Sequence, residues 1–208
     1  MKNSDLAVRF LFALTGVIFI AFGSGVLRAG NVGIDPLTAC GFALSHQLGI
    51  SLGVFMLGFN ISVLIVIFFF GKKYIGLGTI VNMTLIGFLI EHFYHLIADA
   101  ITFSLTLLWQ AAFLILGILI FTFGISLYMT AQLGISPYDA ISPVIVDQTH
   151  VKFKIVRIIQ DTLAAVIAII FGGPVGIGTI ISAFFTGPLI DFWNERAAKP
   201  LMKRLTGG

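Results

Sequence analysis

Six long apolar runs constrain what this chain can fold into. The first covers residues 6–29, and a helix of that length reaches about 36 Å at 1.5 Å per residue, enough to cross a bilayer core of about 30 Å. The mean hydropathy is +1.08 and 10% of residues are charged, against about 25% in soluble domains. These values exclude a soluble domain and a disordered chain. The single cysteine, Cys40, excludes a disulfide scaffold.

The apolar runs predict an all-α membrane protein with six transmembrane helices. The six spans are residues 6–29, 51–70, 76–97, 103–129, 153–171 and 178–193. Two further stretches, 36–48 and 137–148, reach only about 20 Å each as helices and cannot cross alone. If both did cross, the chain would have eight spans.

Basic residues favour six spans over eight. With a cytoplasmic N-terminus, six spans place eleven of the twelve Lys and Arg residues on the inner side and leave Arg28 outside. That bias is what the positive-inside rule requires, whereas eight spans would move Lys72 and Lys73 outside. Both termini are therefore expected in the cytoplasm. The inner set is Lys2, Arg9, Lys72, Lys73, Lys152, Lys154, Arg157, Arg196, Lys199, Lys203 and Arg204.

The chain also consists of two similar halves. The tetrapeptide G-I-D-P at 33–36 returns 101 positions later as G-I-S-P at 134–137, and G-x-G-T-I at 76–80 returns 100 positions later at 176–180. Self-similarity at a fixed offset indicates an internal repeat. We divide the chain into a first repeat, residues 1–101, and a second repeat, residues 102–208.

Each repeat holds one long span, one short segment and two further spans. Because three is odd, the second repeat must enter the membrane from the opposite side, which is the inverted-repeat plan of many secondary transporters. We therefore expect two inverted three-span repeats, each with one short broken or re-entrant helix. Small-residue faces could pack helices within one chain or between the two chains of a homodimer; they are formed by Gly16, Gly23, Gly117 and Gly124.

The repeated stretches also carry a family resemblance. Residues 134–140 (GISPYDA), 76–82 (GLGTIVN) and 176–180 (GIGTI) resemble the signature stretches of the YczE/YyaS/YitT group of bacterial integral membrane proteins. The YczE-type branch is the nearest, and the resemblance covers nearly the whole chain. Tyr138 stands where the pattern favours Trp. The resemblance implies a small multi-pass protein of the bacterial plasma membrane and little about its biochemistry.

The two short segments are the first candidate site. Pro36 and Pro137 suit the first position of a helix, and Asp35 and Ser136 suit the N-cap. Such a half-helix either directs its polar end toward a substrate or ion or lies on the membrane surface as an amphipathic helix. Asp35 already neutralises one helix dipole, whereas Ser136 leaves the other open to an anion.

Ionisable and amide residues within the spans form the second candidate site. Asp161, with Gln160 beside it, lies halfway along residues 153–171, and its repeat counterpart Asn60 lies centrally in residues 51–70. Asp161 is expected to bind and release a proton during transport, or to join helices through hydrogen bonds. Asp139 lies one turn into the second short segment.

Glu91 and Asp191 are a third, repeated acidic pair near the far ends of their spans. Glu91 and His95 share one helix face at spacing i, i+4 and could relay protons. Two ligands without a third make a weak metal site, so we predict no metal.

Several chemistries lack their sequence signatures. No P-loop, H-E-x-x-H, C-x-x-C or G-x-S-x-G pattern occurs, so we expect no enzyme and no cofactor. The net charge of +3 predicts contact with the lipid bilayer and no nucleic-acid partner. With Asp161 halfway along its span, the leading hypothesis is a secondary transporter of a small cationic or neutral organic solute. The alternatives are a substrate-capture subunit of a larger uptake system and a non-transporting scaffold or assembly factor.

Overall fold

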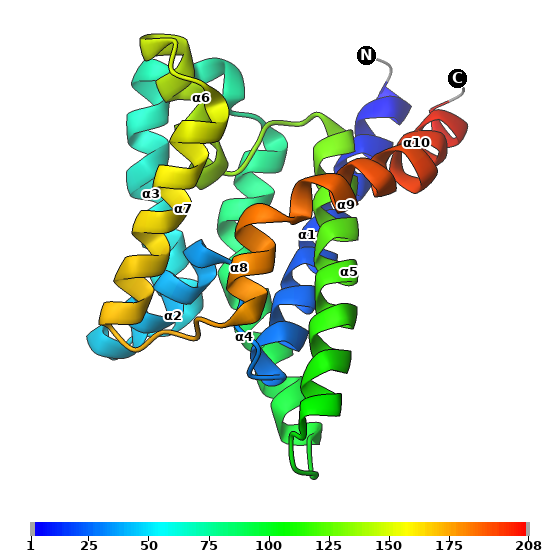
Figure 1. Cartoon of the computed structure of the whole chain (residues 1–208). Coiled ribbons are helices and arrows are strands. Elements are labelled where there is room, and N and C mark those ends of the chain that lie inside the picture. The colour runs from blue at the N-terminus through cyan, green and yellow to red at the C-terminus, as the bar shows by residue number, and fades with distance from the viewer. Residues whose placement is uncertain (1–2, 207–208) are drawn as a thin grey trace.

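A computed structural model describes residues 3–206, and every regular element in that part of the chain is a helix (Figure 1). The prediction of an all-helical chain is confirmed. Lys2, counted among the inner basic residues, lies outside the described residues. The elements are α1 (Asn3–Ala29), α2 (Pro36–Leu48), α3 (Leu52–Phe70), η1 (Lys72–Tyr74), α4 (Leu77–Ala100), α5 (Leu107–Ala131), α6 (Pro137–Thr149), α7 (Phe153–Ile170), α8 (Ile177–Phe184), α9 (Thr186–Trp193), η2 (Asn194–Ala198) and α10 (Lys199–Leu205).

Four of these helices, α1, α3, α4 and α5, are long and apolar enough to cross a membrane. Helix α7 has 18 residues but carries Lys154, Arg157 and Asp161. Helices α8 and α9 have eight residues each. Within residues 3–206, four helices are therefore long and apolar enough to span a membrane, by length and composition alone.

The prediction of one continuous helix over residues 178–193 is wrong. The helix breaks at Phe185 into α8 and α9. Pro188 accounts for the break, because proline has no N–H to donate to the carbonyl four residues earlier. The corresponding residue of the first half is Phe88, and α4 continues through it. After the break, α9, η2 and α10 turn away from α8 (Figure 1).

Helices α1 and α5 cross in close contact because glycines lie at the crossing. A Cβ on Gly16 would lie 2.8 Å from the carbonyl oxygen of Gly124, and a Cβ on Gly23 would lie 2.9 Å from that of Gly117. Later residues of α1 thus meet earlier residues of α5, so the two helices are antiparallel. In Figure 1, α1 begins at the end of the molecule that holds both termini, and α5 runs back toward it. The predicted small-residue faces therefore pack helices within one chain.

The loop before each short helix is hydrogen-bonded to the other half of the chain. The amide of Gly78 donates to the carbonyl of Leu133 at 2.7 Å, and the amide of Gly178 donates to the carbonyl of Val32 at 2.7 Å. The hydroxyl of Thr79 also donates to the carbonyl of Ile135 at 2.7 Å. These bonds fix where each short helix begins.

Both short helices begin at the predicted residues. The Asp35 side chain accepts the amide of Thr38 at 3.0 Å, and the Ser136 hydroxyl accepts the amide of Asp139 at 3.1 Å. Figure 1 shows α2 and α6 beginning inside the molecule and ending at opposite ends of it. Helix α2 packs against α3, α7 and α8 and buries most of its first two turns. These contacts favour a broken half-helix over a helix lying on the membrane surface.

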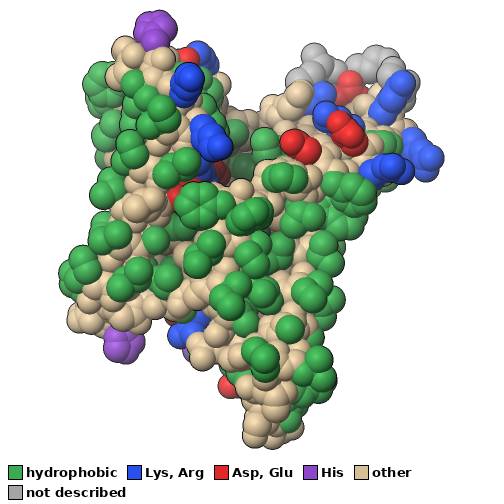
Figure 2. All heavy atoms as spheres, in the orientation of Figure 1, with side chains coloured by type: hydrophobic (Ala, Val, Ile, Leu, Met, Phe, Trp, Pro, Cys, Tyr) green, Lys and Arg blue, Asp and Glu red, His purple; other side chains and the backbone are tan. Residues whose placement is uncertain are grey.

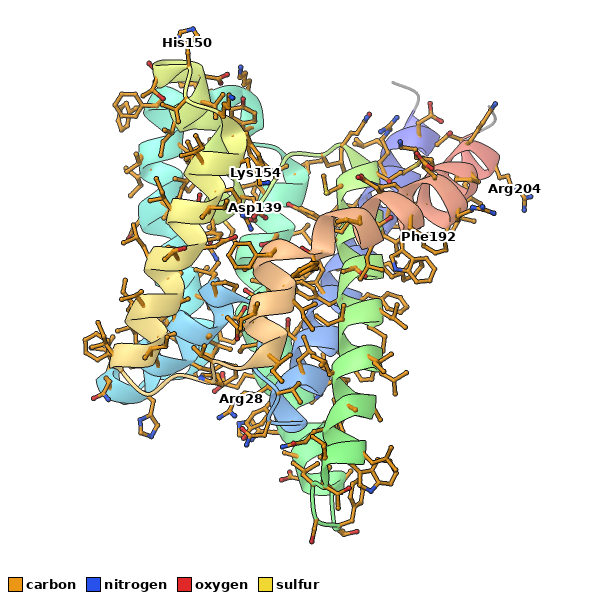
Figure 3. The ribbon with its side chains drawn as sticks, in the orientation of Figure 1. Arg28, Asp139, His150, Lys154, Phe192 and Arg204 are labelled. Carbon is orange, nitrogen blue, oxygen red and sulfur yellow. The ribbon has the colours of Figure 1, made fainter. Side chains whose placement is uncertain are left out.

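Charged side chains gather at one end of the molecule. Figure 2 shows lysine and arginine side chains mainly at the end that holds the termini, which we call the terminal end. In Figure 3, Arg204 and Lys154 lie toward the terminal end, and Arg28 lies near the opposite end. This separation agrees with the charge bias that the sequence predicts.

Candidate functional site

An ionic network lies where the start of α6 meets α7. The Nε of Arg157 donates to Oδ2 of Asp161 at 2.9 Å, and its Nη1 donates to Oδ1 of Asp139 at 2.7 Å. Arg157 and Asp161 are one turn apart on α7, whereas Asp139 belongs to α6. A single guanidinium therefore bridges carboxylates from two helices.

Tyr138 completes the surroundings of the buried carboxylate. Its hydroxyl donates to Oδ1 of Asp161 at 2.8 Å, so both Asp161 oxygens accept a hydrogen bond. The Cζ of Arg157 lies 5.4 Å from the centre of the Tyr138 ring, within the range of a cation–π contact. Asp161 thus stays buried because an aromatic hydroxyl and a guanidinium replace water around it.

Neutral polar groups hold the two helices in register. The Ser142 hydroxyl donates to Oε1 of Gln160 at 2.6 Å, and the Gln160 amide donates to the carbonyl of Tyr138 at 2.8 Å. The Ser136 hydroxyl donates to Oδ2 of Asp139 at 2.7 Å. The carboxylate of Asp139 therefore lies at the N-terminus of α6. The prediction that Ser136 leaves this helix end open to an anion is wrong, because Asp139 already occupies it.

Asp35 brings a third carboxylate to the same region from the first half. It caps α2 and is close enough to Asp139 and Asp161 for their negative charges to repel its own. The starts of the two short helices therefore converge at one acidic region inside the molecule.

Solvent reaches the network from one side. The side chain of Asp139 is 47% exposed, that of Arg157 is 33% exposed and that of Asp161 is 8% exposed. Figure 2 shows a hollow between α6–α7 and the α8–α9 segment, with charged side chains inside it. Figure 3 places Asp139 on the side of α6–α7 that faces this hollow. The network thus leads from an accessible carboxylate to a buried one.

The remaining predicted residues lie elsewhere or lack contacts with the network. Asn60 is buried, and its Oδ1 has no hydrogen-bond partner within residues 3–206. Glu91 accepts the amide of Gly53 at 3.3 Å and so caps the start of α3. Asp191 is exposed on α9. The described residues hold no group of three or more potential metal ligands.

Arg157 and Tyr138 are the residues that sequence reasoning missed. Arg157 was counted only among the basic residues of the inner side, but it lies in the second turn of α7 and faces two carboxylates. The i, i+4 spacing of Arg157 and Asp161 was the available signal. Tyr138 directly follows the repeated G-I-S-P stretch, and nothing in that pattern indicates a hydrogen-bond donor.

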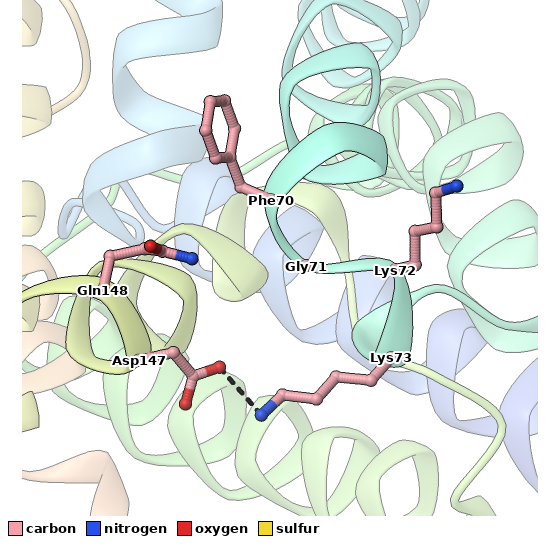
Figure 4. A pocket seen from close by; sticks show the side chains of 6 residues that line it. All are labelled: Phe70, Gly71, Lys72, Lys73, Asp147 and Gln148. Carbon is pink, nitrogen blue, oxygen red and sulfur yellow. Dashed lines mark ion pairs between the residues drawn. The ribbon is translucent and has the colours of Figure 1, made fainter.

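A second polar cluster lies at the terminal end. An open pocket of about 510 Å³ is lined by residues from the end of α3, from η1 and from the end of α6 (Figure 4). The Nζ of Lys73 lies 2.9 Å from Oδ2 of Asp147, and the Tyr74 hydroxyl donates to that oxygen at 2.9 Å. The hydrogen bond to Asp147 raises the pKa of Lys73 above its ordinary value. This ion pair joins the loop of the first half to α6.

The apolar helices, together with charged groups buried among them, define a multi-pass helical membrane protein. The DUF6198 family, described as a family of unknown function, matches residues 7–195. The chain belongs to that family.

Three relatives share most of the chain. The uncharacterized membrane protein YczE of Bacillus subtilis (strain 168) is 29% identical over 193 residues, which cover 91% of this chain and 87% of YczE. An uncharacterized protein of Haemophilus influenzae is 27% identical, covering 91% and 83% of the two chains, and YyaS of Bacillus subtilis is 22% identical, covering 88% and 90%. These matches confirm the resemblance to the YczE/YyaS group. No solved structure matches the chain significantly.

Proposed function

We propose that the protein is a secondary transporter of a small cationic or neutral organic solute in the bacterial plasma membrane. It acts as a carrier and not as an enzyme. In this proposal α7 and the α8–α9 segment complete six crossings, and both termini lie in the cytoplasm. The two repeats, 1–101 and 102–208, are inverted relative to one another.

The antiparallel crossing of α1 and α5 supports the inverted arrangement. These helices occupy corresponding places in the two repeats, and their glycines pair in reverse order. The loops at Val32 and Leu133 also occupy corresponding places, and each bonds to the other half in the same way. Inverted repeats with half-helices that meet near mid-membrane are typical of secondary transporters.

The ionic network is the observation on which a transport function rests. Asp139, Arg157 and Asp161 form a continuous series of charge-assisted contacts from a half-exposed position to a buried one. Ionisable groups at membrane depth are costly and commonly mark solute or proton pathways. Asp161 is the group proposed to exchange a proton, and Gln160, Asp139, Ser136 and Asp35 form its polar surroundings.

The test is transport by purified protein in liposomes with an imposed proton gradient. Wild-type protein should accumulate one or more of a panel of small organic cations and neutral solutes. Asp161→Asn should keep the fold and accumulate none above the passive level. Asp191→Asn removes an exposed acidic residue of α9 and should leave accumulation unchanged. Accumulation by Asp161→Asn equal to that of wild type would remove Asp161 as the coupling residue.

A structural role is the second candidate function, and one observation favours it. Both Asp161 oxygens are hydrogen-bonded, as expected of a contact that only joins helices in a scaffold or assembly factor. In that case neither the wild-type protein nor Asp161→Asn should transport any solute of the panel.

A further inference from the structure

The acidic region inside the molecule holds three carboxyl groups and one guanidinium. Asp35, Asp139 and Asp161 lie close enough to repel one another. Among the described residues, Arg157 is the cation that these carboxylates pair with. One guanidinium therefore serves three carboxyl groups, and a further cation bound beside them would favour their ionised forms.

The surroundings of Arg157 have the form of a receptor for an organic cation. We use the term cation cage for Tyr138, Asp139 and Asp161. The guanidinium lies between the two carboxylates at 2.7 and 2.9 Å, and its Cζ lies 5.4 Å from the Tyr138 ring. Planar donors suit carboxylates, and aromatic faces suit weakly hydrated organic cations. The cage is thus better matched to a guanidinium or an ammonium group than to a hydrated metal ion.

Arg157 occupies this cage from a position that permits exchange. Its side chain is one-third exposed and Asp139 is nearly half exposed, so a ligand can approach from the hollow in Figure 2. The side chain is tethered by its own helix one turn from Asp161, and a change of rotamer can release both carboxylates without moving the backbone.

Tyr128 supplies a second, independent sign of a ligand. Its hydroxyl is buried and has no hydrogen-bond partner within residues 3–206, and its side chain is 4% exposed. It lies close enough to Asp139 to experience the charge of that carboxylate. A buried hydroxyl without a partner is costly, and a ligand held by Asp139 would provide one.

We propose that the cation cage binds a small guanidinium or primary ammonium compound in exchange for the side chain of Arg157. This inference rests on the proposed transport function, since the bound cation would be the solute carried. Arg157 is then an internal competitor that neutralises the cage when no solute is present. The buried Tyr128 hydroxyl of α5 then hydrogen-bonds to the solute.

The experiment measures binding of methylguanidinium to the full-length protein in detergent, by titration calorimetry. Arg157→Gln removes the competitor and should bind methylguanidinium at least ten times more tightly than wild type. Lys154→Gln, which removes an exposed positive charge one turn earlier on α7, should match wild type. Adding Asp161→Asn to Arg157→Gln should abolish the gain, and Tyr128→Phe should weaken binding several-fold.

A second variant keeps the proposal testable if Arg157→Gln does not fold. Arg157→Lys retains a cation beside Asp161 but is too short and too compact to bridge both carboxylates, and it should bind methylguanidinium at least three times more tightly than wild type. Equal affinity of wild type and the folded Arg157 variant for methylguanidinium would overturn the proposal. An equal increase in affinity in Lys154→Gln would also overturn it.

Failure of this inference differs from failure of the proposed function. If the variants bind methylguanidinium as expected but liposomes accumulate no cation, the cation cage is supported and the transport function is rejected. If no variant binds methylguanidinium but Asp161-dependent accumulation of neutral solutes is found, transport stands and the cage is rejected.

Discussion

A Cβ on Gly134 would lie 2.5 Å from the amide nitrogen of Gly76, so these two residues meet backbone to backbone. Gly134 also has a left-handed backbone, with φ +96°. The contact joins the loop before α6 to the start of α4, and Gly33 and Gly176 make the corresponding contact for α2 and α8. Both contacts lie directly before Asp35 and Ser136, the residues that cap the two short helices.

Gly134→Ala should therefore destabilise the protein. A left-handed alanine costs about 1–2 kcal/mol and overpacking adds about 1–3 kcal/mol, which predicts a fall in Tm of roughly 5–15 °C for a chain of this size. Thermal unfolding of the purified protein measures the change. Gly58→Ala is the matched control, because a Cβ at Gly58 meets no atom within 4 Å. Equal Tm values for the two variants would contradict the prediction.

Gln47 and Gln148 allow a direct test of the inverted arrangement. They are exposed residues at corresponding places near the ends of α2 and α6. In a Cys40→Ala background, an impermeant maleimide should label Gln47→Cys only from outside the cell and Gln148→Cys only from inside. Lys73→Cys should behave like Gln148→Cys, because Lys73 pairs with the neighbouring Asp147. Labelling of both glutamine positions from one side would rule out inversion.

Arg157 and Asp161 should be energetically coupled. Arg157→Gln leaves a buried carboxylate without its cation and should cost about 2–3 kcal/mol, below the range of about 3–5 kcal/mol for fully buried pairs because Arg157 is one-third exposed. Asp161→Asn should lower the stability by less, because Arg157 still forms its ion pair with Asp139. The double variant should be close in stability to Asp161→Asn, so the coupling in a double-mutant cycle should equal the cost of Arg157→Gln, about 2–3 kcal/mol. Additive losses of stability would show that the two side chains act independently.

Lys73 should react slowly with an amine-acylating reagent. Asp147 raises the pKa of Lys73 through a hydrogen bond, so the neutral, reactive amine forms at higher pH than usual. Asp147→Asn should increase the rate of Lys73 acylation near pH 9, and mass spectrometry of peptides measures it. Lys72, whose Nζ lies over the Phe68 ring at 4.3 Å, is the internal control and should not change. If Asp147→Asn left the rate of Lys73 acylation unchanged, the ion pair between Lys73 and Asp147 would not persist in solution.

The fold followed from features that are local in the sequence. Apolar runs and helix caps gave the ends of most helices to within a few residues, and Pro36 and Pro137 marked the starts of α2 and α6. The break at Phe185 was not predicted, because hydropathy is insensitive to the single proline that separates α8 from α9. An alignment of Phe88 with Pro188 would have revealed it.

The site was predicted only in part, because it depends on contacts between helices. Asp161, Gln160, Asp139 and Ser136 were proposed from position alone, and the structure brings them together. Their roles in binding remain predictions. Arg157 was missed because the sequence does not distinguish a basic residue that pairs inside the protein from one that is solvated at the membrane surface. Nothing in the sequence placed Tyr128 near Asp139.

The reciprocal bonds from Gly78 to Leu133 and from Gly178 to Val32 have a consequence for the origin of the chain. Each half supplies the carbonyl that the other half needs, and the glycines of α1 and α5 pair in the same reciprocal way. Two separate copies of a half-length ancestor, inserted in opposite orientations, make the same set of reciprocal contacts. Gene fusion would then have freed one copy to keep amide and thioether side chains at Asn60 and Met56, while the other acquired Asp161 and Arg157.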